Sequence, residues 1–144
     1  MILTHCMLKS LKDRNELPEN ASVIKTIVTI EAVENIVESF NATLIDTLTG
    51  FKYMGEKIKE FEETHSNTFI FVLEESYGYL AGTFVRDKDA VVVATLITLY
   101  YKEQRLTLYE ALIKLYDEYG YTKGDLVSIR VKWKRRTRKN IKLY

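Results

Sequence analysis

Three short runs of β-branched and apolar residues alternate with two amphipathic segments in the first half of the chain. The runs cover Ser22–Thr29, Ala42–Leu48 and Thr68–Leu73, and each has the length of a buried strand. The segments between them, Glu31–Phe40 and Met54–Glu63, carry apolar residues at helical spacing. This alternation predicts a three-layer α/β/α domain, because each parallel strand pair needs a helical crossover that covers one face. All three strands are expected to be parallel and centrally buried.

Further elements complete a single domain over residues 1–131, with a mainly parallel sheet of about four strands and the last strand at the edge. The apolar run Ala90–Gln104 predicts a helix that is buried on most sides. Thr29 and Thr107 are expected to cap the helices that follow them. The other expected elements are a helix over Met1–Glu16 that ends before Pro18, a helix over Leu106–Tyr119 that stops at Gly120, and the edge strand Leu126–Val131.

The composition favours a soluble, cytoplasmic domain. A chain of 144 residues with 47% hydrophobic residues and one proline can bury a single core. Its longest apolar run is too short to span a bilayer, and its first residues do not have the pattern of a signal peptide, so we expect no membrane partner. Cys6 is the only cysteine, which excludes an internal disulfide, and it is expected to be buried on the first helix.

Polar residues follow the third apolar run directly. Glu74, Glu75 and Ser76 come after Leu73, and ligands of open α/β sheets bind beyond the carboxyl ends of the strands. Glu74 and Ser76 are two positions apart, so on an extended loop they can point the same way. A charged acceptor beside a hydroxyl suits the hydroxyl groups of a sugar. The residues Tyr77, Gly78 and Gly82 are then expected to turn the chain.

A charged cluster, Arg86-Asp87-Lys88-Asp89, precedes the helix that starts at Ala90. An ammonium group at the mouth of a cleft attracts phosphate, so Lys88 is a candidate phosphate ligand and Arg86 a second one. The two aspartates suit the start of a helix. The alternative is a solvated charged turn, which the residues alone leave open.

Three segments together resemble the α-D-phosphohexomutases, the family of bacterial phosphoglucomutase and phosphomannomutase. They are DTLTGFKYMGEKI at 46–58, EESYG at 74–78 and GTFVRDKDA at 82–90. The resemblance extends over about residues 8–131. Such enzymes have four domains, and this chain resembles the third, which carries the sugar-recognition loop. The resemblance implies that the parent enzyme interconverts hexose 1-phosphate and hexose 6-phosphate.

The resemblance also implies roles for individual residues. Glu74 and Ser76 match the positions that contact the 3- and 4-hydroxyls of the hexose, and Lys88 matches a lysine that reaches the substrate. Thr49 and Gly50 match a turn that faces the active-site cleft. The family usually has glycine before the first glutamate, where this chain has Leu73. A loop that contacts the 3- and 4-hydroxyls does not distinguish glucose from mannose.

Other signatures of the family are absent from the chain. It lacks the Ser-His-Asn-Pro loop with the phosphorylated serine, the Asp-x-Asp-x-Asp magnesium loop and the terminal arginine-rich phosphate loop. We therefore expect no catalytic residue, metal ligand or cofactor in this chain, which alone should be inactive. The parent would use Mg²⁺, with glucose 1,6-bisphosphate as activator. The expected partners are hexose phosphate and the missing domains, and apolar surface left by those domains would favour self-association.

The end of the chain, residues 132–144, differs in composition from the domain. Eight of the 21 basic residues and no acidic residue lie between Arg130 and Tyr144, so the remaining 13 basic residues face 20 acidic ones. One reverse translation of this tail, read one nucleotide later, gives a family-like continuation, which suggests the hypothesis of a frameshift. The alternatives are a basic arm that binds nucleic acid, which the few aromatic residues disfavour, and a stand-alone sugar-phosphate binding module without catalysis. We expect no nucleic-acid partner.

Overall fold

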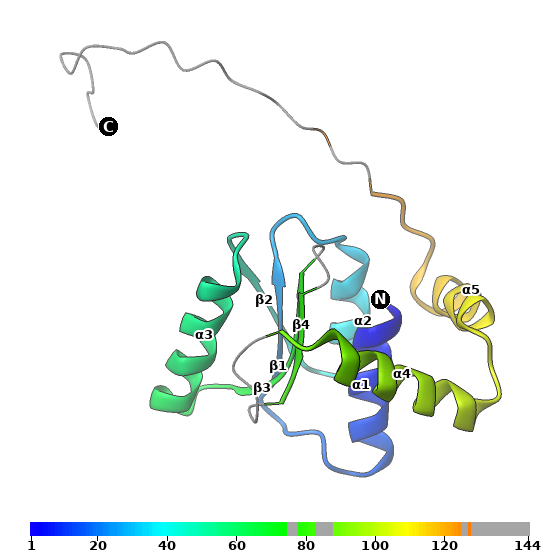
Figure 1. Cartoon of the computed structure of the whole chain (residues 1–144), viewed down its shortest axis with the longest axis horizontal. Coiled ribbons are helices and arrows are strands. Elements are labelled where there is room, and N and C mark those ends of the chain that lie inside the picture. Colours follow the sequence, from blue (N-terminus) through cyan, green and yellow to red (C-terminus); the bar gives the residue numbers. More distant parts are fainter. Residues whose placement is uncertain (75–77, 83–87, 125–126, 128–144) are drawn as a thin grey trace.

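Strand β1 lies at the centre of a four-stranded sheet (Figure 1). The computed structural model describes residues 1–74, 78–82, 88–124 and 127. Within them, the strands are β1 (Ala21–Thr26), β2 (Thr43–Thr47), β3 (Thr68–Glu74) and β4 (Gly78–Ala81). The helices are α1 (Ile2–Asp13), α2 (Ala32–Ser39), α3 (Phe51–Thr64), α4 (Ala90–Gln104) and α5 (Leu108–Tyr119).

The sheet has the strand order β2-β1-β3-β4. Strand β1 pairs in parallel with both β2 and β3, whereas β4 pairs antiparallel with β3. The chain therefore moves from β1 to one side through α2 and returns past β1 to the other side through α3. This change of direction falls between β1 and β3, and ligands of such sheets bind at the carboxyl ends of the two strands that flank it.

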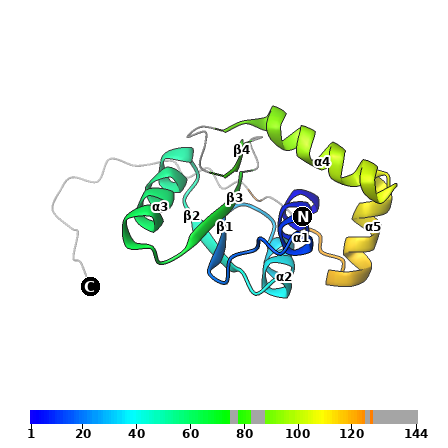
Figure 2. The same ribbon diagram turned by 90° about the horizontal axis from the view of Figure 1, so that it is seen from below.

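The helices cover the two faces of the sheet unequally (Figure 2). Helix α3 lies on one face, where Met54, Ile58 and Phe61 pack against Ile24 and Val72. Helices α1 and α2 lie on the opposite face, and their core includes the following buried residues: Leu8, Val23, Val33, Ile36, Val37 and Phe71. Helices α4 and α5 contact α1, where Cys6, Tyr101 and Ala111 form a smaller buried cluster. The three-layer α/β/α class and the mainly parallel sheet are confirmed.

Not all three parallel strands are central. Every residue of β1 is buried, as predicted for a strand that is apolar on both faces. Strand β2 instead lies at the edge of the described sheet, and only Thr47 of its five residues is buried. The prediction of central burial was wrong for β2, because β1 flanks it on one side only.

The edge strand on the other side comes from a stretch expected to be a turn. Tyr79, Leu80 and Ala81 pair with Leu73, Val72 and Phe71, and this ladder with β3 makes β4 a strand despite its short length. Tyr77 lies outside the described residues, and Gly82 has a φ of 72°, as a turn glycine does. Of the expected edge strand 126–131, the described part is Val127, which is exposed and outside any strand.

Helix α4 has the predicted bounds but not the predicted burial. Its buried residues are Val93 and Tyr101, whereas Val91 is 76% exposed and Leu99 is 52% exposed. The helix starts beside β4 at the sheet edge and runs across α1 towards α5 (Figure 2), so one of its sides faces the molecule and the other faces outward. An apolar sequence therefore did not mean a buried helix here.

The helix caps were predicted with mixed success. Thr107 forms a capping box with Glu110 at the start of α5, and Gly120, with a φ of 88°, follows its end, both as expected. Thr29 does not cap α2, whose N-cap residue is Glu31 without a side-chain cap. The Thr29 hydroxyl instead lies 3.0 Å from that of Thr26. None of the described helices is long and apolar enough to cross a membrane.

Candidate functional site

Glu74 is the last residue of β3, at the edge of the sheet where the parallel strands end. Its side chain is 10% exposed, so the carboxylate is largely withdrawn from water although β3 ends here. Gly78 is its antiparallel partner on β4. A buried carboxylate needs polar groups that compensate its charge, and these groups can come from the protein or from a ligand. The surroundings of Glu74 are therefore a candidate binding site.

Lys88 is the nearest cationic partner described for Glu74. The Lys88 Nζ lies 3.9 Å from the Glu74 Oε2, and the Lys88 side chain is 45% exposed. A tight charge-assisted hydrogen bond between nitrogen and oxygen is about 2.7–2.9 Å long, so this pair is loosely engaged. Residues that the sequence separates by 14 positions are thus brought together as a carboxylate and an ammonium.

The start of α4 fixes Lys88 beside β4. The backbone N–H of Asp89 donates to the Tyr79 carbonyl at 2.8 Å, and the Asp89 carboxylate accepts from the N–H groups of Val91 and Val92 at 2.9 and 3.0 Å. Asp89 is therefore the N-cap of α4, which agrees with the prediction that an aspartate suits this helix start. Because Asp89 is bound at both its backbone and its side chain, Lys88 is anchored directly before a capped helix.

Thr49 and Gly50 lie at the same edge of the sheet, in the connection from β2 to α3. Gly50 is the N-cap of α3 and has a φ of 118°, a backbone conformation that favours glycine. Thr49 is exposed. Strand β1 separates β2 from β3, so at a strand spacing of about 4.8 Å the axes of β2 and β3 are about 10 Å apart. Thr49 and Gly50 thus follow a strand that lies two positions from the strand of Glu74 in the sheet.

Other predicted site residues lie outside the described part of the chain. They are Ser76 and Arg86, together with their neighbours Glu75 and Asp87. Lys52, which follows the Thr49-Gly50 turn, lies in the first turn of α3, and its Nζ is 4.6 Å from the centre of the Tyr53 ring. The described candidate site therefore consists of Glu74 and Lys88 on one side and Thr49 and Gly50 on the other.

Lys25 is a notable residue of this edge that was not predicted as functional from the sequence. Its side chain is fully buried on β1, and its Nζ lies 2.7 Å from the Asp46 carboxylate of β2 and 3.2 Å from the Glu31 carboxylate before α2. Burial alone lowers the pKa of Lys25, but the hydrogen bonds and charges of Asp46 and Glu31 outweigh burial and leave the pKa raised. The sequence carried a signal for this residue, because Lys25 is the single charge in a run that is apolar on both faces. A charge buried in such a strand requires a counter-charge.

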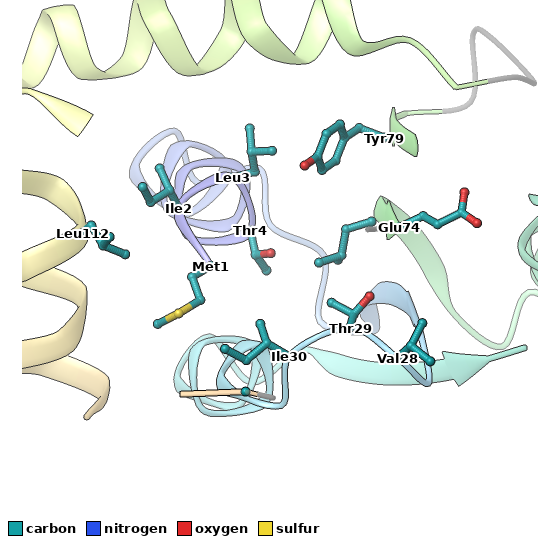
Figure 3. A pocket seen from close by; sticks show the side chains of 12 residues that line it. Met1, Ile2, Leu3, Thr4, Val28, Thr29, Ile30, Glu74, Tyr79 and Leu112 are labelled. Atoms are coloured by element: carbon teal, nitrogen blue, oxygen red, sulfur yellow. The ribbon is translucent and has the colours of Figure 1, made fainter. Parts of the chain in front are cut away.

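A pocket of about 580 Å³ lies beyond the ends of β1 and β3 (Figure 3). Its walls are mostly apolar, and Glu74 is at its rim with the carboxylate pointing away from Ile2 and Leu112. The Thr4 hydroxyl, buried in its wall, has no hydrogen-bond partner among the described residues. Apolar walls do not suit a ligand with many hydroxyl groups, so the polar candidate site lies beside this pocket rather than inside it.

Metal ligands do not gather in the described region. Among residues 1–74, 78–82, 88–124 and 127, no group of three or more His, Cys, Asp or Glu side chains is placed to hold a metal ion. The carboxylates of Glu31 and Asp46 are engaged with Lys25. The described residues therefore do not fit Mg²⁺, which needs clustered oxygen ligands, and we assign no step to it.

The fold and the site together define a three-layer α/β/α domain with polar residues at the carboxyl ends of its parallel strands. Residues 2–119 match the family model described as "Phosphoglucomutase/phosphomannomutase, alpha/beta/alpha domain III". The chain therefore belongs to the phosphoglucomutase/phosphomannomutase family and corresponds to its domain III. The resemblance inferred from the three sequence segments is confirmed.

Relatives with the name phosphoglucomutase are considerably longer than this chain. The protein from Staphylococcus haemolyticus (strain JCSC1435) is 38% identical over 117 residues, which are 79% of this chain and 21% of the relative. A phosphoglucomutase from Staphylococcus aureus (strain bovine RF122 / ET3-1) is 38% identical over 109 residues, 74% of this chain and 19% of the relative. The chain thus spans about a fifth of the length of these relatives.

Solved structures support the same fold. A putative phosphomannomutase from Thermus thermophilus superposes with a TM-score of 0.65 at 16% sequence identity, covering 84% of this chain and 26% of that one. The open form of parafusin, a phosphoglucomutase from Paramecium, gives a TM-score of 0.59 at 20% identity, covering 83% of this chain and 21% of that one. At such identities the likeness concerns the fold alone.

Proposed function

We propose that this chain is the sugar-recognition domain of a phosphoglucomutase or phosphomannomutase. The observation that carries the proposal is the pairing of Glu74 with Lys88 at the carboxyl end of β3, within a domain of this family. A carboxylate accepts hydrogen bonds from sugar hydroxyls, and an ammonium attracts a phosphate. One loop region thus offers the two kinds of group that a hexose phosphate needs.

Each candidate residue has a distinct role in this proposal. Glu74 accepts hydrogen bonds from adjacent hydroxyls of the hexose, with Ser76 as the neighbouring hydroxyl partner, and Lys88 and Arg86 attract the phosphate. The Thr49-Gly50 turn, two strands away, forms the opposite wall and lets backbone approach the ligand closely. The axes of β2 and β3 are about 10 Å apart, a spacing that would accommodate one sugar ring.

The full reaction would need further parts of a longer mutase. We propose that the parent interconverts hexose 1-phosphate and hexose 6-phosphate, that its phosphoserine and Mg²⁺ belong to other domains, and that glucose 1,6-bisphosphate is its activator. The described residues of this chain would bind and orient the sugar, and the chain alone would not transfer phosphate. The outward apolar residues of α4, such as Val91 and Leu99, would contact those domains, and without them would favour self-association.

A chemical-shift titration tests the binding role. The ¹⁵N-labelled chain is titrated with glucose 1-phosphate and, separately, glucose 1,6-bisphosphate, and the Glu74→Ala variant is compared with Glu56→Ala. Glu56 is an exposed residue of α3 and serves as the matched loss of one carboxylate. We expect shifts at Thr49, Gly50, Glu74 and Lys88 that the Glu74→Ala variant loses and the control retains.

Two results would contradict the proposal. If millimolar sugar phosphate shifts no resonance of the wild-type chain, the domain does not recognise the ligand by itself. If both glutamate variants bind as the wild type does, the Glu74 carboxylate is not part of the site. Inorganic phosphate at the same concentration provides a further control, because an equal response would indicate a phosphate site without sugar recognition.

A further inference from the structure

Gly78 lies directly against the two charged side chains of the candidate site. As the antiparallel partner of Glu74, it places its Cα beneath the Glu74 side chain. A Cβ atom added at Gly78 would lie 2.7 Å from the Glu74 Oε2, 3.2 Å from the Glu74 Cβ and 3.3 Å from the Lys88 Cδ. The Glu74 carboxylate and the aliphatic part of the Lys88 side chain therefore occupy the space that a side chain at position 78 would fill.

Backbone conformation does not explain this glycine. The described glycines with a φ in the left-handed region are Gly50, Gly82 and Gly120, and Gly78 is not among them. An alanine can therefore adopt the backbone of β4 at position 78, and the obstacle to it is the contact of its Cβ with Glu74 and Lys88. Space for those side chains is the reason left for a glycine here.

We propose that Gly78 is a positioning residue of the sugar site, which sets where the Glu74 carboxylate and Lys88 lie. This inference rests on the proposed function. The loose separation of 3.9 Å between the two charged groups depends on both side chains lying over the bare Cα of residue 78. Any larger residue would push the carboxylate out of the place from which it and Lys88 can meet one ligand.

The size of the displacement follows from the same distances. Ordinary van der Waals contact begins at 3.4 Å, so the Glu74 Oε2 would have to move by about 0.7 Å from a new Cβ at 2.7 Å. That atom is the far end of a flexible side chain and can move, whereas the Glu74 Cβ at 3.2 Å and the Lys88 Cδ at 3.3 Å would have to give by a few tenths of an ångström for the domain to fold around an alanine. If the Glu74 carboxylate is displaced by this amount, its hydrogen bond to a ligand loses its alignment, and the affinity for the ligand should fall by about tenfold or more.

The Gly78→Ala variant tests this role, with Gly55→Ala as its control. Gly55 lies inside α3, and an added Cβ there would meet no atom within 4 Å. We expect Gly78→Ala to remain folded and to bind glucose 1-phosphate at least tenfold more weakly, while Gly55→Ala binds as the wild type does. In the Glu74→Ala background, Gly78→Ala should cause a much smaller further loss of affinity, since only the Lys88 side chain remains to be displaced.

A second measurement separates this inference from the proposed function. The ¹³Cδ resonance of Glu74 reports on the surroundings of its carboxylate without any ligand, and we expect it to shift in Gly78→Ala and to stay unchanged in Gly55→Ala. An unshifted resonance, or unchanged affinity in Gly78→Ala, would overturn the positioning role. If the wild type does not bind sugar phosphate while the resonance does shift, the proposed function fails and Gly78 is shown to position a carboxylate with another purpose.

Discussion

Replacing Asp46 by asparagine should destabilise this domain because it removes the closest counter-charge of a buried lysine. The Lys25 side chain is fully buried, and Asp46 and Glu31 are its two carboxylate partners, at 2.7 and 3.2 Å. Breaking a fully buried ion pair costs about 3–5 kcal/mol. The Asp46 side chain is 50% exposed and Glu31 remains in place, so we expect Asp46→Asn to lower the free energy of unfolding by about 2 kcal/mol.

A comparison of three further variants makes the reasoning testable. Glu31, at 3.2 Å and with a side chain 66% exposed, is the weaker partner, so Glu31→Gln should cost about 1 kcal/mol or less. Lys25→Met removes the buried charge and retains most of the volume, so it should cost less than Asp46→Asn despite being the more drastic change. In the Lys25→Met background, Asp46→Asn should have nearly no effect.

Urea unfolding followed by far-UV circular dichroism measures these free energies, provided that the slope with urea is the same for all variants. The reasoning would be refuted if Asp46→Asn cost the same with and without the Lys25 ammonium. It would also be refuted if Lys25→Met were the most destabilising of the single variants.

Three further predictions follow from features of α1, α4 and α5. Burial raises the pKa of the Cys6 thiol to about 12 and that of Tyr100 to about 12, so both groups ionise more readily in the unfolded chain. The free energy of unfolding should therefore be at its full value below about pH 9 and should fall by about 2 kcal/mol by pH 10.5 through Cys6. Urea unfolding across this pH range should show a smaller fall in the Cys6→Ala variant. Thr107→Ala removes the capping box of α5 and should lower the free energy of unfolding by about 1 kcal/mol, whereas an equal stability by thermal melting would show that α5 does not need its cap. Leu99→Lys on the outward side of α4 should shift the chain towards the monomer in sedimentation experiments if apolar contacts drive self-association, and an unchanged distribution would exclude this surface.

Local signals were sufficient to predict much of this fold. Strands β1 and β3 are recognisable because the runs Ser22–Thr29 and Thr68–Leu73 are rich in β-branched and aromatic residues and contain Lys25 as their single charge. The ends of α5 were predictable because Thr107 and Gly120 act on the backbone next to them. Such features depend on residues that are close in sequence, so a pattern captures them well.

Features that depend on distant partners were not predictable in the same way. Strand β4 has four residues, including Gly78, and it is a strand because β3 lies beside it. The apolar face of α4 was expected to be buried, but an apolar pattern does not say what covers a helix. The sequence likewise shows Lys25 as a lone charge without showing that Asp46 and Glu31 meet it.

The candidate site shows the same division. Glu74 and Lys88 were both predicted, and the structure brings them within 3.9 Å of each other. Ser76 and Arg86 lie outside the described residues, so their roles stay predictions. The contribution of Gly78 was missed, because its pattern is that of a turn and its significance lies in the two side chains above it.

The buried lysine also specifies how the strands align. Lys25 lies opposite Asp46 in the ladder between β1 and β2, with its side chain on the face where Glu31 precedes α2. Because side chains alternate between the two faces of a strand, a slip of one residue would turn the ammonium towards α3, among Met54 and its apolar neighbours. A slipped register would therefore bury the Lys25 ammonium away from Asp46 and Glu31, which disfavours it. The ion pair thus favours the observed register, whatever ligand the domain binds.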